Sequence, residues 1–103
     1  MPSQGGYFAL WAINRADKLE ERQRVREAHR ARLREGAPGL TVVLGGPTTR
    51  EDGTMAGSLI VFKADDIEKV RAFVAGDPYM LQGVYEPDSV CIRPWVWGIG
   101  RPD

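Results

Sequence analysis

The chain has 103 residues, with 14 Lys and Arg against 14 Asp and Glu, so its formal net charge is zero. This length predicts a single domain, residues 1–103, with one hydrophobic core. The balanced charge argues against nucleic-acid and anionic-membrane partners, because both require a basic surface.

The first half of the chain predicts a strand, a helix and a second strand. Residues 7–13 are apolar at every position, which is typical of a strand buried on both faces. Asp17 and Glu20 have the spacing of a capping box and predict a helix over residues 18–35, ended by Gly36. A short strand follows over residues 40–44, and we expect Gly45-Gly46-Pro47 to turn the chain out of it.

The second half predicts a strand, a helix and a final strand. Asp52-Gly53 is a turn signal before a strand over residues 57–63. Asp65 and Glu68 form a second capping box, which predicts a helix that ends at Gly76. A loop over residues 77–88 leads to a last strand over residues 90–97. The apolar stripe of the second helix is formed by Ile67, Val70, Phe73 and Val74.

The order β-α-β-β-α-β predicts an α+β, ferredoxin-like fold, with a four-stranded antiparallel sheet and two helices on one face. Two helices cover only one face, yet the first strand is apolar on both, and the last carries Trp95 and Trp97. We therefore expect a homodimer in which the uncovered face packs against a second copy.

His29 is the only histidine, and it is a candidate catalytic base. It shares one helical face with Val25 and Leu33, so it should point inward or towards the rim of a cleft. A histidine in this position is either a hydrogen-bonded core residue or a general base.

Asp77 follows the helix end at Gly76 and precedes Pro78. It is a candidate N-cap of a short helical turn through Tyr79 and Leu81. A carboxylate beside an imidazole would instead orient a general base, but sequence spacing leaves open whether Asp77 meets His29.

The remaining polar groups give weaker signals. Arg22, Arg26 or Arg32 lie near the His29 face and are candidates for an anion site, although most arginines of this helix should be solvated. Cys91 lies in an apolar strand, where a lone cysteine acts as a small hydrophobic residue, and it predicts no disulfide or metal cluster. With no signal peptide and no spanning segment, a cytoplasmic location is expected.

Besides His29, the chain contains a series of short motifs. They are Leu44-Gly45-Gly46-Pro47, Asp52-Gly53, Gly57-Ser58-Leu59-Ile60-Val61, Ala64-Asp65, Asp77-Pro78-Tyr79, Gly83-Val84-Tyr85-Glu86 and Ile92-Arg93-Pro94-Trp95. With these motifs in family order, the chain resembles the YCII-related family. The resemblance covers about residues 7–99. It implies a dimeric α/β-barrel and an active site built from the residues that match His29 and Asp77 here. Ala37-Pro38-Gly39 lengthens the turn before the second strand relative to the family pattern.

The combined hypothesis is a cofactor-independent enzyme that acts on a small molecule by elimination, isomerisation or dehydrochlorination. His29 is its general base and Asp77 the orienting partner, while Ser58, Tyr79 and Trp11 contact the substrate. No metal is expected. One alternative is a non-catalytic module, either small-ligand-binding or stress-associated, that uses the same cleft to hold a small ligand. Another is a structural dimerisation unit that acts with a protein partner.

Overall fold

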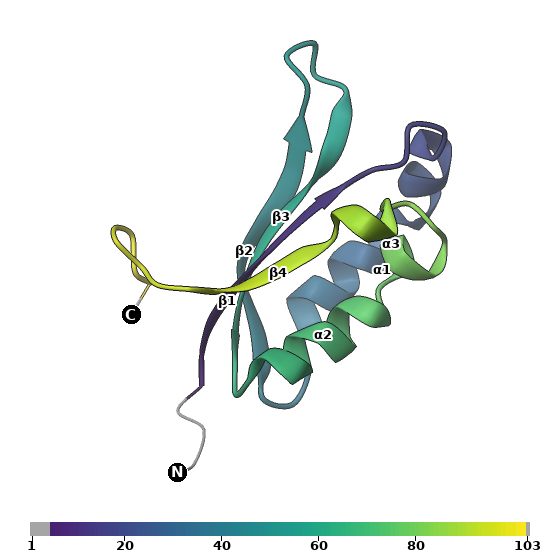
Figure 1. The fold of residues 1–103 in the computed structure, drawn as a ribbon. Coiled ribbons are helices and arrows are strands. Elements are labelled where there is room, and N and C mark those ends of the chain that lie inside the picture. The colour runs from purple at the N-terminus through teal and green to yellow at the C-terminus, as the bar shows by residue number, and fades with distance from the viewer. Residues whose placement is uncertain (1–4, 103) are drawn as a thin grey trace.

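The computed structural model describes residues 5–102 and contains one four-stranded antiparallel sheet with the strand order β2-β3-β1-β4. The predicted β-α-β-β-α-β order is confirmed, and the helices lie together on one face of the sheet (Figure 1). Two short helical elements precede the last strand. The elements are β1 (Gly6–Ile13), α1 (Leu19–Glu35), β2 (Leu40–Thr49), β3 (Met55–Ala64), α2 (Ile67–Ala75), α3 (Pro78–Leu81), the 3₁₀ turn η1 (Pro87–Ser89) and β4 (Cys91–Trp95).

The core lies between the sheet and the helices. Alternate residues of β1, namely Phe8, Leu10 and Ala12, point towards the helices and are buried. The predicted stripe of α2 meets them, because Val70, Phe73 and Val74 are buried and Ile67 packs at the edge of the core. Burying apolar side chains of this kind contributes about 1.5–3 kcal/mol each to folding.

Among residues 5–102, the helices leave the opposite face of the sheet uncovered (Figure 1). We call it the open face and define it by Trp11, Ile13, Leu44, Leu59 and Trp95, which are all at least 39% exposed. The register places Trp11 opposite Leu59 on β3 and Cys91 on β4, so these side chains lie on the same face. The first strand is therefore buried on one face only in the single chain, and Cys91 is partly exposed.

The expected turn at Gly45-Gly46-Pro47 is wrong, because β2 continues through these residues to Thr49. They pair with Ile60, Leu59 and Ser58 of β3, after a register shift between Val42 and Leu44. Proline is tolerated here because β2 is an edge strand, where one side of the backbone needs no sheet partner. Pairing along β3 thus overrides a local turn signal.

Both expected capping boxes are misplaced. The N-cap of α1 is Lys18, without a side-chain cap, so Asp17 does not cap it. At α2 the N-cap is Asp66 and not Asp65, and its carboxylate accepts a hydrogen bond of 3.0 Å from the Lys69 amide. The helix ends at Gly36 and Gly76 are confirmed.

The last third of the chain positions the site. The expected loop over residues 77–88 contains α3 and the start of η1, and β4 ends at Trp95 instead of Trp97. Asp77 caps α3, as its position before Pro78 predicts, by accepting a hydrogen bond of 2.8 Å from the Tyr79 amide. This short helix packs against α1 and therefore brings Asp77 next to the His29 helix.

Candidate active site

His29 and Asp77 are in direct contact, although 48 residues separate them. The Nδ1 atom of His29 lies 2.8 Å from both carboxylate oxygens of Asp77. Both residues are buried, with exposed fractions of 6% and 4%. A carboxylate accepts hydrogen bonds, so Nδ1 is the donor, and the neutral ring then carries its lone pair on Nε2.

Asp77 is held in place by three groups. Its Oδ1 atom accepts from the Tyr79 amide and contacts His29, while Oδ2 lies 3.4 Å from Nη1 of Arg32. The Arg32 guanidinium also lies over the Phe73 ring, with its Cζ atom 4.2 Å from the ring centroid. The helix-cap and imidazole-partner interpretations of Asp77 are thus both correct, since one carboxylate makes both contacts.

Tyr79 stacks on the imidazole of His29. The two ring centroids are 3.8 Å apart and the ring planes differ by 11°. The Cζ atom of Arg22 lies 4.6 Å from the Tyr79 ring centroid, and Arg22 also donates to Asn14. Burial raises the pKa of Tyr79, and the positive charge of Arg22 opposes that shift. These packed groups leave the His29 ring little freedom to rotate away from Asp77.

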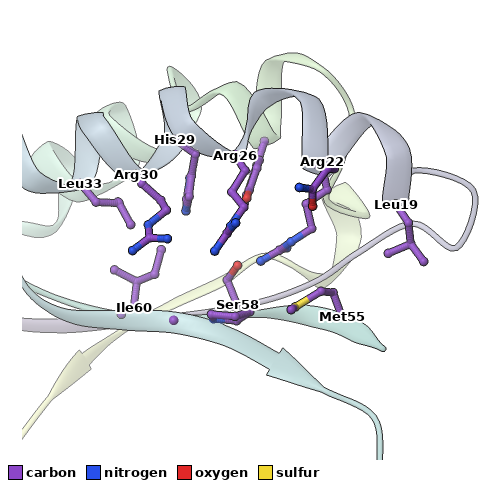
Figure 2. A pocket seen from close by; sticks show the side chains of 14 residues that line it. Leu19, Arg22, Arg26, His29, Arg30, Leu33, Met55, Ser58 and Ile60 are labelled. Atoms are coloured by element: carbon purple, nitrogen blue, oxygen red, sulfur yellow. The ribbon is translucent and has the colours of Figure 1, made fainter. Parts of the chain in front are cut away.

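A cavity of about 570 Å³ opens between α1 and the sheet (Figure 2). Its helix wall consists of Leu19, Arg22, Gln23, Arg26, His29, Arg30 and Leu33. Its sheet wall consists of Gly45, Gly46, Pro47, Met55, Ser58 and Ile60, and Tyr79 also lines it. The size is within the range of small-molecule sites. His29 lies among the side chains that reach from α1 towards β3.

Ser58 presents a hydroxyl to this cavity from β3. Its Oγ atom accepts a hydrogen bond of 2.8 Å from the Tyr85 hydroxyl, and both side chains are buried. Burial raises the pKa of Tyr85, although the hydrogen bond to Ser58 opposes the shift. Because the Tyr85 hydroxyl is the donor in this hydrogen bond, the Ser58 hydroxyl can donate its own proton to a ligand.

The structure brings together His29, Asp77, Ser58 and Tyr79, but it places Trp11 elsewhere. Trp11 lies on the open face and is 47% exposed, so it does not line the cavity of its own chain. Its neighbours in β1 alternate between the two faces, and the sequence did not reveal which apolar set the helices cover.

The sequence reasoning did not assign Arg30 to the cavity, and it did not predict the hydrogen bond between Tyr85 and Ser58. Arg30 follows Arg26 by four residues, so the helical spacing was a usable signal for it. Of the three arginines considered for an anion site, Arg22 and Arg26 line the cavity, whereas Arg32 contacts Asp77. Nothing near Tyr85 in the sequence indicated a hydrogen bond to a residue 27 positions away.

Among residues 5–102, no three His, Cys, Asp or Glu side chains are grouped so as to hold a metal ion. No helix formed by these residues has both the length and the apolar character needed to cross a membrane.

The YCII-related domain model matches residues 7–96, which form nearly all of the described fold. The chain belongs to the YCII-related family. It is 33% identical to Protein YciI of Escherichia coli O6:H1 and of Shigella flexneri over 89 residues, which cover 81% of this chain and 91% of each relative. It is also 27% identical to an uncharacterized protein of Haemophilus influenzae over 95 residues, which cover 86% of this chain and 95% of that protein.

A solved structure with the same fold is that of 5-chloro-2-hydroxyhydroquinone dehydrochlorinase (TftG) from Burkholderia phenoliruptrix AC1100, in complex with 2,5-dihydroxybenzoquinone. The TM-score is 0.76 at 26% sequence identity, and the match covers 89% of this chain and 95% of the other. The ferredoxin-like α+β fold is therefore shared with an enzyme that binds a small molecule.

Proposed function

We propose that the cavity is the active site of a cofactor-independent enzyme that transforms a small molecule by proton abstraction, through elimination, isomerisation or dehydrochlorination. The observation that carries the proposal is the buried contact of 2.8 Å between His29 Nδ1 and Asp77 at the edge of a ligand-sized cavity. A base oriented by a carboxylate is the arrangement that general-base catalysis requires.

In this mechanism Nε2 of His29 takes a proton from the substrate while Asp77 holds Nδ1–H. In an elimination, the electron pair of the broken bond to hydrogen forms a new double bond, and the leaving group departs with its bonding electrons as an anion. In an isomerisation, the imidazolium returns the proton to a different atom of the substrate. Asp77 stabilises the positive charge that the imidazole gains, and Ser58 donates a hydrogen bond to the substrate.

The dehydrochlorinase with the same fold supports this reaction type, because loss of hydrogen chloride is an elimination. The proposal needs no cofactor, since the base and its orienting partner are both side chains of this chain. A reducing, cytoplasmic setting belongs to the proposal and is in keeping with the free thiol of Cys91.

The test is chloride release from 5-chloro-2-hydroxyhydroquinone, together with deuterium uptake from heavy water by a panel of enolisable compounds. We expect His29→Ala to lower the rate on the compound that reacts by about 10²–10⁴-fold. Circular dichroism and the unfolding midpoint establish that the variant is folded, and Arg34→Ala, an exposed change on the same helix, is the matched control. An unchanged rate in folded His29→Ala would rule out the base.

The orientation of the base has its own test. Nitrogen-15 NMR of the imidazole should show that the neutral ring carries its proton on Nδ1 and none on Nε2. Asp77→Asn should weaken this tautomer preference, because an amide can present either a donor or an acceptor to Nδ1. Ligand binding without turnover of any compound would favour the alternative, a binding module.

We also propose that the protein is a homodimer formed through the open face. Trp11, Ile13, Leu44, Leu59 and Trp95 are exposed together on one side of the sheet, next to an aromatic cluster of Tyr7, Trp95 and Trp97. Contiguous apolar surface of this kind is uncommon on monomers. Pairing with the same face of a second copy covers the apolar side chains of both chains.

A further inference from the structure

The cavity has a row of positive charges along its helix wall. Arg22, Arg26 and Arg30 are spaced by four residues on α1, and all three line the cavity. Figure 2 shows their side chains reaching from α1 towards the sheet, on both sides of His29. One such step along a helix rises about 6 Å, so the row extends over about 12 Å. No Asp or Glu is among the described residues that line the cavity.

The three arginines differ in the contacts that their guanidinium groups make with other side chains of the chain. Arg22 is buried, donates to Asn14 at 2.9 Å and stacks on Tyr79. Arg26 and Arg30 make no ion pair or hydrogen bond with another described side chain, although both point into the cavity. By contrast, Arg24 on the same helix pairs with Glu21, and Arg32 reaches Asp77. The two unpaired guanidinium groups therefore lie where a ligand would bind.

The other polar groups of the cavity complete a donor-rich environment. A guanidinium has five N–H donors and no acceptor. The Ser58 hydroxyl already accepts from Tyr85 and thus has its own proton to donate. The sheet wall opposite includes Gly45, Gly46 and Pro47, which carry no charge and fill little space. A ligand that satisfies these groups must offer several acceptor oxygens and negative charge.

We propose that the cavity binds a small organic acid as its anion, with the acidic oxygens held between Arg26 and Arg30 and the adjoining carbon presented to Nε2 of His29. The reaction part of this inference rests on the proposed function, whereas the binding part does not. The two arginines, which are exposed residues on the helix wall, would also stabilise the negative charge that develops on those oxygens as the proton leaves. Arg26 and Arg30 are thus specificity-determining residues for an anionic substrate.

The test uses benzoate, its neutral counterpart benzamide and inorganic phosphate as probes, followed by NMR of the backbone amides and the arginine Nε–H groups. We expect benzoate to shift the signals of Arg26, Arg30 and His29 in a saturable manner, with benzamide binding at least about tenfold more weakly. The double variant Arg26→Gln/Arg30→Gln should weaken benzoate binding by at least about tenfold. The control Arg34→Gln, an exposed arginine outside the cavity, should change it less than about twofold.

Three outcomes would overturn the proposal that the cavity binds an anion through Arg26 and Arg30. These are equal binding of benzoate and benzamide, an equal loss in Arg34→Gln, and no saturable shift at the cavity with benzoate up to about 20 mM. Phosphate binding that is tighter than benzoate binding would overturn the assignment to an organic acid. Failure of the proposed function looks different: benzoate binding that depends on the arginines would persist in a protein that catalyses none of the test reactions.

Discussion

The two faces of the sheet differ in how far their side chains are buried. Ser58 and Leu59 are neighbours in β3, yet Ser58 is 2% exposed beside the cavity and Leu59 is 39% exposed on the open face. On the helix-covered face, the buried polar groups His29, Asp77 and Ser58 all have partners within the chain. On the open face, no helix of the described residues covers the large apolar side chains (Figure 1).

This difference separates the face that one chain completes from the face that, in the proposed homodimer, a second copy would cover. Buried polar groups are costly unless they are hydrogen-bonded, so the covered face needs a fully specified network before the chain is stable. The open face needs only an apolar cover of matching shape. The comparison predicts that changes on the covered face act on the folding and chemistry of each chain, whereas changes on the open face act on assembly.

The largest expected effect is on assembly. We expect the wild-type chain to have twice its 11.4 kDa chain mass in solution, and Leu59→Glu to have the single-chain mass. A two-fold interface would bury two unpaired carboxylates, which should raise the dissociation constant by at least about a thousandfold. Light scattering after size-exclusion chromatography measures both masses.

The matched control for assembly is Leu81→Glu. Leu81 is also an exposed leucine, but it lies on α3 in the helix layer. This variant should keep the dimer. A wild-type protein that elutes as a monomer at every concentration would break the comparison, because the open face would then be stable in water.

The second effect is on the stability of the fold, at the Asp77 carboxylate, which contacts His29, Arg32 and the Tyr79 amide. Asp77→Ala removes the α3 cap and leaves His29 and Arg32 without their buried partner. We expect it to lower the free energy of unfolding by about 3–5 kcal/mol, as measured by urea denaturation. Asp88→Ala, an exposed aspartate of η1, should change it by less than about 0.5 kcal/mol. Equal small losses would mean that the His29–Asp77 contact contributes nothing to the fold.

The third effect compares the two faces directly, in the monomeric Leu59→Glu background. Ser58→Ala leaves the buried Tyr85 hydroxyl without its acceptor and should lower the free energy of unfolding by about 1–3 kcal/mol. Leu44→Ala on the open face should cost less than about 1 kcal/mol, since the leucine is already 45% exposed. Urea denaturation of both variants tests the ranking, and a reversed order would contradict it.

The sequence was sufficient for the fold because the apolar periodicities are strong. The strand at residues 7–13, the α2 stripe and the helix ends at Gly36 and Gly76 were all predictable from local pattern. The N-caps of α1 and α2 were not predicted, in contrast to Asp77 at α3. At α2, Asp65 and Asp66 are adjacent acids, and only the backbone geometry at the helix start selects Asp66.

The candidate site was predictable only in part. The inward direction of His29 follows from its helical position, since Val25 and Leu33 share its face. Its contact with Asp77 is a tertiary event between α1 and the start of α3, so no local pattern encodes it. Trp11 was assigned to the ligand because β1 is apolar on both faces, and alternation alone does not identify the face that the helices cover.

The smallest expected effect is the contribution of Tyr85 to the pH dependence of the free energy of unfolding. Burial raises the pKa of Tyr85, whereas a tyrosine in the unfolded chain ionises near pH 10. Above about pH 10 the folded state therefore holds more protons than the unfolded state, and the stability present at lower pH is lost as pH rises, by up to about 1.4 kcal/mol per pH unit for this group. Urea denaturation between about pH 8 and pH 11 should show a shallower decline in Tyr85→Phe than in the wild type.

The Tyr85→Phe comparison also bears on the cavity. Tyr85 touches the cavity through Ser58, so its ionisation reports whether water reaches the sheet wall from that side. Equal declines in the two proteins would mean that Tyr85 ionises within the fold, and that the wall is hydrated. A shallower decline in Tyr85→Phe would mean that the neutral hydroxyl of Tyr85 persists, which leaves the Ser58 proton directed at the ligand.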